Sequence, residues 1–579
     1  MYRRWLGRAQ LVGLLVLCAC GSEDAKGSDQ RAIFPNAAIA ASDTSSHGAA
    51  NAAPVIAGPS SVAMSAAVPV QTATAPRMPG AGAAGAGAPI PVDAGVTPQA
   101  PTAERYDHVG TNPFVLAAHD PFSTFAADVD TASYDIFRRN AEHSLLPDQN
   151  SVRVEEFVNY FAYAYPAPAA DAEHPFTISV AAAANPYGRD TTLLRVGIQA
   201  KHPPASEKKA ANVVFLVDVS GSMQTEDKLP LVQYLLTQAL EVLDADDTVS
   251  VVTYASGTEV RLAPTPVLQA DRIRSVVNGL SAGGSTNGEG GIQLAYKQAE
   301  AAFVQGGINH IVLCTDGDFN VGVSSVDALV ELIKTKRETG VTLTALGFGL
   351  GNLNDSLMER VSNAGNGIYS VISSRTQAAR YAEDHLLATL MHVAKDMKIQ
   401  VEWNPKHVLA YRLIGYEDRD IADMDFRNDI VDAGEVGAGH RVTALYEVVR
   451  SGKEIPTASG APKVQSGDAV QGDRDVHDDD LVVVKVRYKQ PNASAADPAA
   501  EVVQRSSPAL LDARFEDADP DLRWTAAIAS FAEILKRSPY ATPTKLGELR
   551  NVFSAQQDRD IERKEFLQLF EKAATLLGH

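Results

Sequence analysis

The sequence predicts an α/β protein with a doubly wound, mostly parallel sheet that is inserted between flanking β-rich segments. Short apolar or β-branched runs alternate with amphipathic helical patterns from about residue 211 to 391, as expected for a parallel sheet covered by helices on both faces. Runs with a two-residue period lie on both sides of this region. Helical patterns also occur near the N-terminus, and apolar helical stripes form a C-terminal helical region.

Composition and charge limit the classes of function. The chain has 579 residues, 45% of them apolar, so several folded units are expected and a wholly disordered protein is excluded. Its formal net charge of −20 repels phosphate backbones, and we expect no nucleic-acid partner. Three cysteines are too few for a disulfide scaffold, and Cys314, in an apolar run, is interpreted as a small buried hydrophobe.

Residues 1–19 are predicted to be a lipoprotein signal peptide. Arginines precede an apolar segment, Leu11–Leu17, that is too short to span a bilayer. Leu17-Cys18-Ala19-Cys20 resembles the bacterial lipobox, which implies that Cys20 becomes the lipid-modified mature N-terminus. Gly21, in place of Asp, implies sorting to the outer membrane of a Gram-negative bacterium. The alternative is an ordinary signal peptide with incidental cysteines.

Residues 20–107 are predicted to be a disordered tether. Ala, Gly, Pro, Ser and Thr dominate this segment, and such a composition cannot offset its ordering entropy by burying a core. A lipid at one end and folded units at the other would hold the protein at a membrane without insertion of the folded part.

The segment 108–210 is expected to form an N-terminal flanking domain. Helical patterns run from 130 to 140 and from 151 to 161, and strand patterns cover 176–180 and 193–198.

The central α/β domain is expected at 211–391. Its strands are predicted at 213–217, 249–253, 310–314 and 341–348. Its helices are predicted at about 227–243, 270–279, 288–304, 325–338 and 354–363.

The remainder, 392–579, is expected to be a C-terminal domain that is first β and then helical. Strands are predicted at 398–403, 441–449 and 481–488, and helical stripes lie within 524–535, 546–553 and 566–577. Because an isolated two-stranded sheet is marginally stable, we expect the strands before 211 and after 397 to pair into one β-sandwich around the central domain.

Loops of the central domain carry a pattern of oxygen ligands. Val217-Asp218-Val219-Ser220-Gly221-Ser222 follows the first strand and resembles the metal-ion-dependent adhesion site of the von Willebrand factor type A family, whose first loop is Asp-x-Ser-x-Ser. This family has a Rossmann-like fold. The resemblance implies a threonine from a second loop, within 283–288, and an aspartate from a third loop, after the strand at 310–314. The implied metal ligands are Asp218, Ser220, Ser222, Thr286 and Asp316.

The chemistry of these residues suits a hard divalent cation. Mg²⁺ prefers octahedral oxygen ligands and keeps several waters, so hydroxyls with one or two carboxylates are suitable; Mn²⁺ and Ca²⁺ are alternatives. The incompletely neutralised cation can attract a Glu or Asp of a protein partner. As a loop-end ligand, Asp218 is expected to be exposed, so that Asp218→Ala leaves the apo fold intact. Taken singly, each loop could equally be a turn.

The resemblance extends beyond the central domain, over about residues 108–575. The segments 125–134 and 153–161 resemble the N-terminal flanking domain of a bacterial group of such proteins. The segments 413–417 and 432–440 resemble the C-terminal domain of unknown function in that group.

Enzyme motifs are weak in this sequence. Asp128-Val129-Asp130 is similar to a phosphatase nucleophile loop, but Ala132 stands where Thr or Val is expected, so we interpret Asp130 as a helix N-cap. The segment 284–287 is not a nucleophile elbow, and 347–351 lacks the spacing of a dinucleotide-binding loop. We therefore expect no enzymatic activity and no catalytic residues.

The sequence as a whole predicts a membrane-tethered, divalent-metal-dependent protein-binding lipoprotein of the cell envelope. It would capture a partner carboxylate at the metal. Two alternatives stay open: an architectural component of an envelope complex with a structural metal, and an unrecognised hydrolase in the flanking domains.

The lipobox resemblance can be tested directly. Cys20→Ser should abolish palmitate labelling and release the mature protein into the soluble fraction, because no thiol remains to carry the lipid. Palmitate incorporation that persists in this variant would rule out the predicted anchor.

Overall fold

The computed structural model describes residues 104–579, except 170, 204–206, 319–324, 430, 432, 467–473, 492 and 494–496. The predicted signal peptide, Cys20 and nearly all of the predicted tether therefore lie outside the described residues. Within the part of the chain that is described, no helix is both long enough and apolar enough to cross a membrane.

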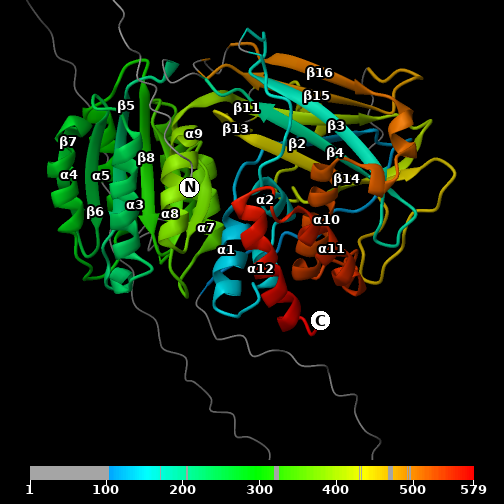
Figure 1. Ribbon diagram of the computed structural model, residues 1–579. Helices are drawn as coiled ribbons and strands as arrows, with labels where there is room; N and C mark the ends of the chain where they lie inside the picture. Colours follow the sequence, from blue (N-terminus) through cyan, green and yellow to red (C-terminus); the bar gives the residue numbers. More distant parts are fainter. Residues whose placement is uncertain are drawn as a thin grey trace, which may run out of the picture. The chain divides into compact units, whose positions relative to one another are not determined.

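The central domain is a six-stranded sheet covered by helices on both faces (Figure 1). Its strand order is β10-β9-β8-β5-β6-β7, and all neighbouring pairs are parallel except β6 and β7. The strands are β5 (Ala211–Asp218), β6 (Thr248–Tyr254), β7 (Thr258–Pro266), β8 (Ile308–Thr315), β9 (Thr342–Phe348) and β10 (Tyr369–Ile372). The predicted doubly wound sheet is confirmed.

The helices of this domain lie within a few residues of their predicted positions. They are α3 (Leu229–Val242), α4 (Ala270–Asn278), α5 (Gly288–Ala301), α6 (Val326–Arg337) and α7 (Asp355–Ala364). Side chains alternate across β5: Val213, Phe215 and Val217 pack with α3 and α4, whereas Val214 and Leu216 pack with α5, α6 and α7. A strand that is apolar on both sides is thus buried between two helical layers.

A short helical segment leads out of the central sheet. It comprises α8 (Arg375–Arg380), the π-helical turn η5 (Tyr381–His385) and α9 (Leu386–Leu390), and it ends at β11 (His392–Trp403). The β11 strand is already part of the flanking structure.

The flanking segments pair with each other in two antiparallel sheets, as predicted. One sheet has the order β1-β12-β14-β4-β3, and the other has the order β13-β11-β15-β16 with β2 also paired to β11. The strands before the central domain are β1 (Val115–Leu116), β2 (Phe122–Ala126), β3 (Phe176–Ala184) and β4 (Thr192–Ala200). Those after it are β12 (Val408–Ile414), β13 (Gly434–Gly437), β14 (Arg441–Arg450), β15 (Val482–Lys489) and β16 (Ala500–Ser506).

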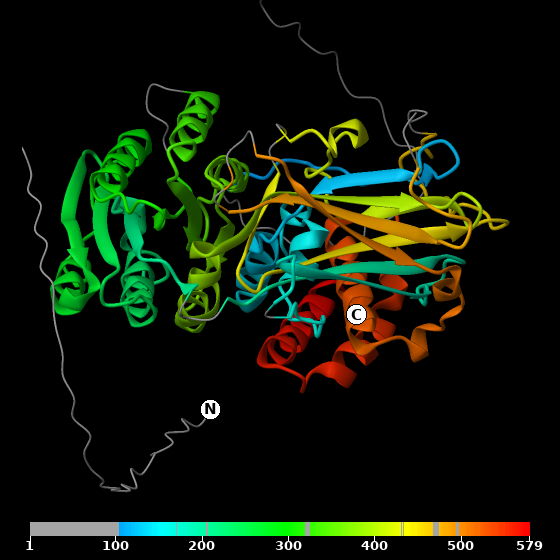
Figure 2. The same ribbon diagram turned by 90° about the horizontal axis from the view of Figure 1, so that it is seen from above.

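The two sheets share one core and so form a sandwich. Trp403 of one sheet packs against Tyr411 and Tyr446 of the other, with ring centroids 5.3 and 5.1 Å apart. Figure 2 shows strands from before the central domain, in blue and cyan, beside strands from after it, in yellow and orange.

A helical layer covers the outer face of the β1-β12-β14-β4-β3 sheet. It combines α1 (Ala132–Glu142) and α2 (Val154–Asn159) with α10 (Pro520–Lys536), α11 (Leu546–Gln556) and α12 (Ile561–Leu576). Aromatic rings from both groups meet in one core, with Phe161 5.2 Å from Trp524 and Phe137 5.4 Å from Phe531. The N-terminal and C-terminal flanks therefore depend on each other in the helices as well as in the sheets.

Buried polar contacts join the central domain to the flanks. Arg153, which precedes α2, donates to the Asp355 carboxylate at 2.8 Å, and both side chains are almost fully buried. Asp130 accepts a hydrogen bond from the backbone N–H of Tyr369 at 2.8 Å and pairs with Arg419. The N-cap residue of α1 is Thr131, so the interpretation of Asp130 as the N-cap is wrong. Its carboxylate binds the edge of the central sheet instead.

The shared sandwich predicts how fragments behave. Residues 397–579 alone should not melt cooperatively with native sheet content, because β14 loses β4 and β11 loses β2. Residues 211–391 should fold alone, since they carry a complete sheet and its helices. Circular dichroism melts of both fragments test this, and a cooperative melt of the 397–579 fragment would contradict the shared sandwich.

Candidate metal centre

The first predicted loop leaves the carboxyl end of β5. Asp218 is the last residue of this strand, and its Oδ1 accepts the backbone N–H of Ser220 at 2.8 Å. The Ser220 and Ser222 hydroxyls lie 3.0 Å apart, within a turn that continues as a short 3₁₀ helix. The Asp-x-Ser-x-Ser spacing thus folds back on itself and gathers a carboxylate and two hydroxyls.

The second loop is bound to the first through its backbone. The N–H of Gly283 donates to the carbonyl of Val219 at 2.7 Å, and the N–H of Gly221 donates to the carbonyl of Gly284 at 3.0 Å. Gly284 has a φ of +90°, and a Cβ there would overlap Ser256, so this close approach requires glycine. Thr286 follows, half-buried, just before α5.

The third loop follows β8, the strand beside β5. Thr315 donates its hydroxyl hydrogen to Oδ2 of Asp218 at 3.0 Å. The next residue, Asp316, accepts the backbone N–H of Asp318 at Oδ1, at 3.2 Å. Gly317, between Asp316 and Asp318, has a φ of +86° and turns the chain sharply. All five predicted ligands therefore lie on loops that adjoin one another at one edge of the central sheet.

The carboxylates of this site are more buried than the sequence predicts. Asp218 and Asp316 have 0% and 1% of their surface exposed, so the expectation that Asp218 is an exposed loop-end ligand is wrong. The pKa of Asp218 is raised to about 6, first by burial and then by the neighbouring charge of Asp316, while hydrogen bonds from Ser220 and Thr315 oppose the rise. Asp218→Ala would leave the Thr315 hydroxyl without its buried partner, at a cost of about 1–3 kcal/mol.

Lys228 is a neighbour of the predicted ligands that no pattern in the sequence indicates. Its ammonium lies 2.9 Å from Oδ2 of Asp316. It stands 88 residues away along the chain, in a polar segment that looks like an ordinary solvated turn, and no sequence signal marks it.

The residues present are compatible with a hard divalent cation. All five predicted ligands offer oxygen, and the Lys228 ammonium balances one of the two buried carboxylate charges. In the described ranges, no group of three or more His, Cys, Asp or Glu side chains is arranged to hold a metal ion. The predicted site has two carboxylates and three hydroxyls, so it is not of the type with three or more His, Cys, Asp or Glu ligands. Its metal-binding role stays a prediction.

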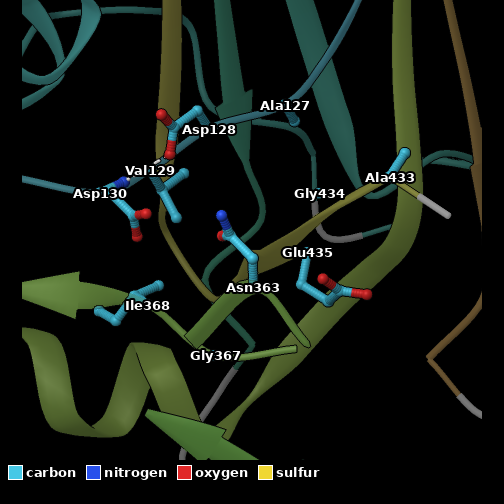
Figure 3. A pocket seen from close by; sticks show the side chains of 10 residues that line it. All are labelled: Ala127, Asp128, Val129, Asp130, Asn363, Gly367, Ile368, Ala433, Gly434 and Glu435. Atoms are coloured by element: carbon cyan, nitrogen blue, oxygen red, sulfur yellow. Dashed lines mark hydrogen bonds between the residues drawn. The ribbon is translucent and has the colours of Figure 1, made fainter. Parts of the chain in front are cut away.

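A separate cavity of about 140 Å³ contains the phosphatase-like residues Asp128 and Asp130 (Figure 3). Asn363 and Glu435 also line it. Both aspartates are already engaged, since Oδ2 of each lies within 3.3 Å of the Arg419 guanidinium. Their carboxylates hold the domain junction together.

The strand order of the central sheet and the loops at its carboxyl edge define a von Willebrand factor type A domain. The family model for the von Willebrand factor type A domain matches residues 212–383, and a von Willebrand factor model matches residues 100–195. The model described as the C-terminal part of the uncharacterized protein YfbK matches residues 388–576.

One relative extends this match along most of the chain. The uncharacterized protein YfbK of Escherichia coli (strain K12) is 36% identical over 484 residues, which cover 82% of this chain and 81% of that protein. The chain therefore belongs to the YfbK family of von Willebrand factor type A proteins. The predicted resemblance is confirmed for the central domain and for the C-terminal domain.

More distant matches cover smaller parts of their own chains or show lower identity. Inter-alpha-trypsin inhibitor heavy chain H3 of Mesocricetus auratus is 27% identical over 165 residues, 27% of this chain and 18% of that protein. A solved structure of a von Willebrand factor type A protein from Catenulispora acidiphila is 16% identical and covers 67% of this chain and 84% of that chain, with a TM-score of 0.38. Domains of this family typically mediate protein interactions, often through a divalent metal.

The predicted ligands should differ in their effect on metal affinity. Asp218→Asn and Asp316→Asn each remove a charge and should weaken Mg²⁺ or Mn²⁺ binding about tenfold or more, whereas Ser222→Ala should weaken it less. Titration calorimetry of the mature chain measures this.

Asp247 offers a matched control for these variants. It is also a fully buried aspartate of the central domain, but it accepts the N–H of Ala211 at the amino end of β5. Asp247→Asn should leave metal affinity unchanged. Equal affinity in the wild type and Asp218→Asn would place the ion elsewhere.

Proposed function

We propose that this protein is a membrane-tethered binding protein that captures a protein partner through a divalent cation at the carboxyl edge of its central sheet. The observation that carries the proposal is the convergence of the three loops: buried Asp218 is bonded to Ser220 and to Thr315, and buried Asp316 follows Thr315 directly. Family membership supports it, because related domains commonly bind partners in this way.

The donor set favours Mg²⁺, with Mn²⁺ or Ca²⁺ as alternatives. Hydroxyl ligands contribute no charge, so the bound cation keeps part of its positive charge and an open coordination position. A Glu or Asp on the partner would supply both the missing oxygen and the missing charge. Binding would then require the metal and an acidic side chain together.

The proposal makes the protein a binding module and assigns it no catalytic residues. Its support is that the one phosphatase-like pair, Asp128 and Asp130, is committed to Arg419. An unrecognised hydrolase in the flanking domains is not favoured by any arrangement described above.

A structural metal is the second candidate, and one observation favours it. Asp218 and Asp316 are buried, and a cation that offsets buried charge also stabilises the fold. In that case the protein would be an architectural part of an envelope complex.

The proposed location follows from the N-terminal sequence. A lipid on Cys20 and a tether over 20–107 would hold the folded part at the cell envelope, at the outer membrane of a Gram-negative bacterium. Partner capture next to a membrane would then involve other envelope components.

Chelation distinguishes capture from architecture. The immobilised mature chain should retain partners from an envelope extract in Mg²⁺ and release them in chelator. In chelator its circular dichroism spectrum should stay unchanged and its thermal unfolding should stay cooperative. Asp218→Asn should behave like the chelated wild type, and Asp247→Asn should behave like the wild type in Mg²⁺.

Two outcomes would contradict the capture proposal. Retention of the same partners with and without chelator would remove the metal from the interaction. Unfolding of the central domain on chelation would assign the ion a structural role. For an identified partner, capture should also be lost when its accessible Glu and Asp residues are replaced.

A further inference from the structure

Lys228 occupies an unusual place beside the predicted metal ligands. It immediately precedes α3, and its side chain runs inward to Asp316, where the ammonium lies 2.9 Å from Oδ2. The side chain of Lys228 is 8% exposed and that of Asp316 is 0% exposed. A lysine so deeply buried is held by its carboxylate partner, because an unpaired charge there would be strongly unfavourable.

The loop after β9 closes over the Lys228 side chain. Gly349 in this loop has a φ of +75°, and a Cβ at this position would overlap the lysine stem. Only a residue without a side chain allows the loop to lie so close. The lysine is therefore enclosed by backbone as well as by its carboxylate.

The N-terminal flank holds this loop in place. Arg139 of α1 donates to the carbonyl of Gly349 at 2.9 Å and pairs with Glu104 at 2.9 Å. Glu104 in turn accepts the backbone N–H of Gly351 at 2.8 Å. The ion pair between Arg139 of α1 and Glu104, which belongs to the end of the predicted tether, thus binds the loop at both Gly349 and Gly351.

We propose that Lys228 is an internal cation that competes with the divalent metal for Asp316 and so lowers the metal affinity of the site. The inference rests on the proposed function, in which Asp316 is a metal ligand. Oδ1 of Asp316 already accepts the N–H of Asp318, and Oδ2 holds the ammonium. A divalent ion bound at this carboxylate would stand within a few ångströms of a like charge, so binding displaces the ammonium from Oδ2.

The competition has a functional consequence. Without metal, Lys228 keeps the buried Asp316 charge balanced and the three loops in place. Metal binding costs the breaking of this ion pair, so the site fills only when the ion, or the ion together with a partner carboxylate, repays that cost. The flanking residues Arg139 and Glu104 favour the metal-free arrangement by holding the loop at Gly349 closed.

Replacement of Lys228 tests the proposal on the full mature chain. Lys228→Met keeps the apolar stem and removes the charge, and it should raise Mg²⁺ affinity about tenfold or more in titration calorimetry. Its melting temperature without metal should fall, since Asp316 loses its partner, and Mg²⁺ should restore most of that loss.

Lys208 offers a matched control. Its side chain is also 8% exposed and pairs with Asp247, whose side chain is 1% exposed, but it lies before the amino end of β5. Lys208→Met should lower the melting temperature without changing Mg²⁺ affinity, and Mg²⁺ should not restore the melting temperature beyond its effect on the wild type.

A measurement on the wild type covers the case in which Lys228→Met does not fold. Reductive methylation of Lys228, followed by mass spectrometry, should be slow without metal and faster at saturating Mg²⁺, because the displaced ammonium leaves its buried partner. Methylation that stays equally slow while Mg²⁺ is bound would overturn the proposal.

The results also separate this inference from the proposed function. If the wild type binds Mg²⁺ and Lys228→Met binds it no more tightly, the competition is wrong while the metal site stands. If neither protein binds Mg²⁺ or Mn²⁺, the metal site itself is wrong and the competition falls with it.

Discussion

The pairing of β4 with β14 is the constraint on which the rest of this structure depends. These strands are antiparallel neighbours from Thr192 opposite Val448 to Gln199 opposite Arg441, although the whole central domain lies between them in sequence. The chain must therefore leave the sandwich after β4 and return to it at β11. The central domain is therefore joined at both ends to one flanking structure. Its own sheet shares no strand with the flanking sheets.

This arrangement gives the flanks a direct hold on the central domain. Arg153 reaches the buried carboxylate of Asp355 on α7, and Asp130 binds the backbone of β10. Breaking such a buried pair by removing one partner typically costs about 3–5 kcal/mol. The flanks are thus bound to the β10 edge of the central sheet, opposite β7. Through Arg139 they also bind the loop after β9.

At the predicted metal site, the structure shows a balance of buried charge that the motif does not reveal. Asp218 and Asp316 are buried where strands β5 and β8 end, and the pKa of Asp218 is raised to about 6, mainly by burial. Lys228 offsets one charge and leaves the other to hydrogen bonds from Ser220 and Thr315. The two buried carboxylates are thus compensated by groups of the protein itself.

The sequence by itself determined the elements whose patterns are local. Strands apolar on both faces, such as 213–217 and 310–314, lie where they are predicted, because burial on two faces requires a continuous apolar run. Helices with an apolar stripe also lie where they are predicted, because burial on one face requires apolar residues at the helical period. Short or edge strands left no such record: β1 has two residues and β7 alternates with exposed positions, so both were missed. That the three predicted loops lie close together could also be predicted from the sequence, since the carboxyl ends of parallel strands lie at the same end of the sheet.

The tertiary structure alone decided which charges meet. Asp130 looked like a helix cap because the next residues are helical, yet its partners are Tyr369 and Arg419, more than two hundred residues away. Asp218 looked exposed because a loop follows it, yet it is fully buried and accepts the hydroxyl of Thr315 from the neighbouring strand β8. Lys228 carried no signal at all. Contacts between residues so far apart in sequence depend on how the domains pack. A local sequence pattern therefore does not show which distant side chains a residue will contact.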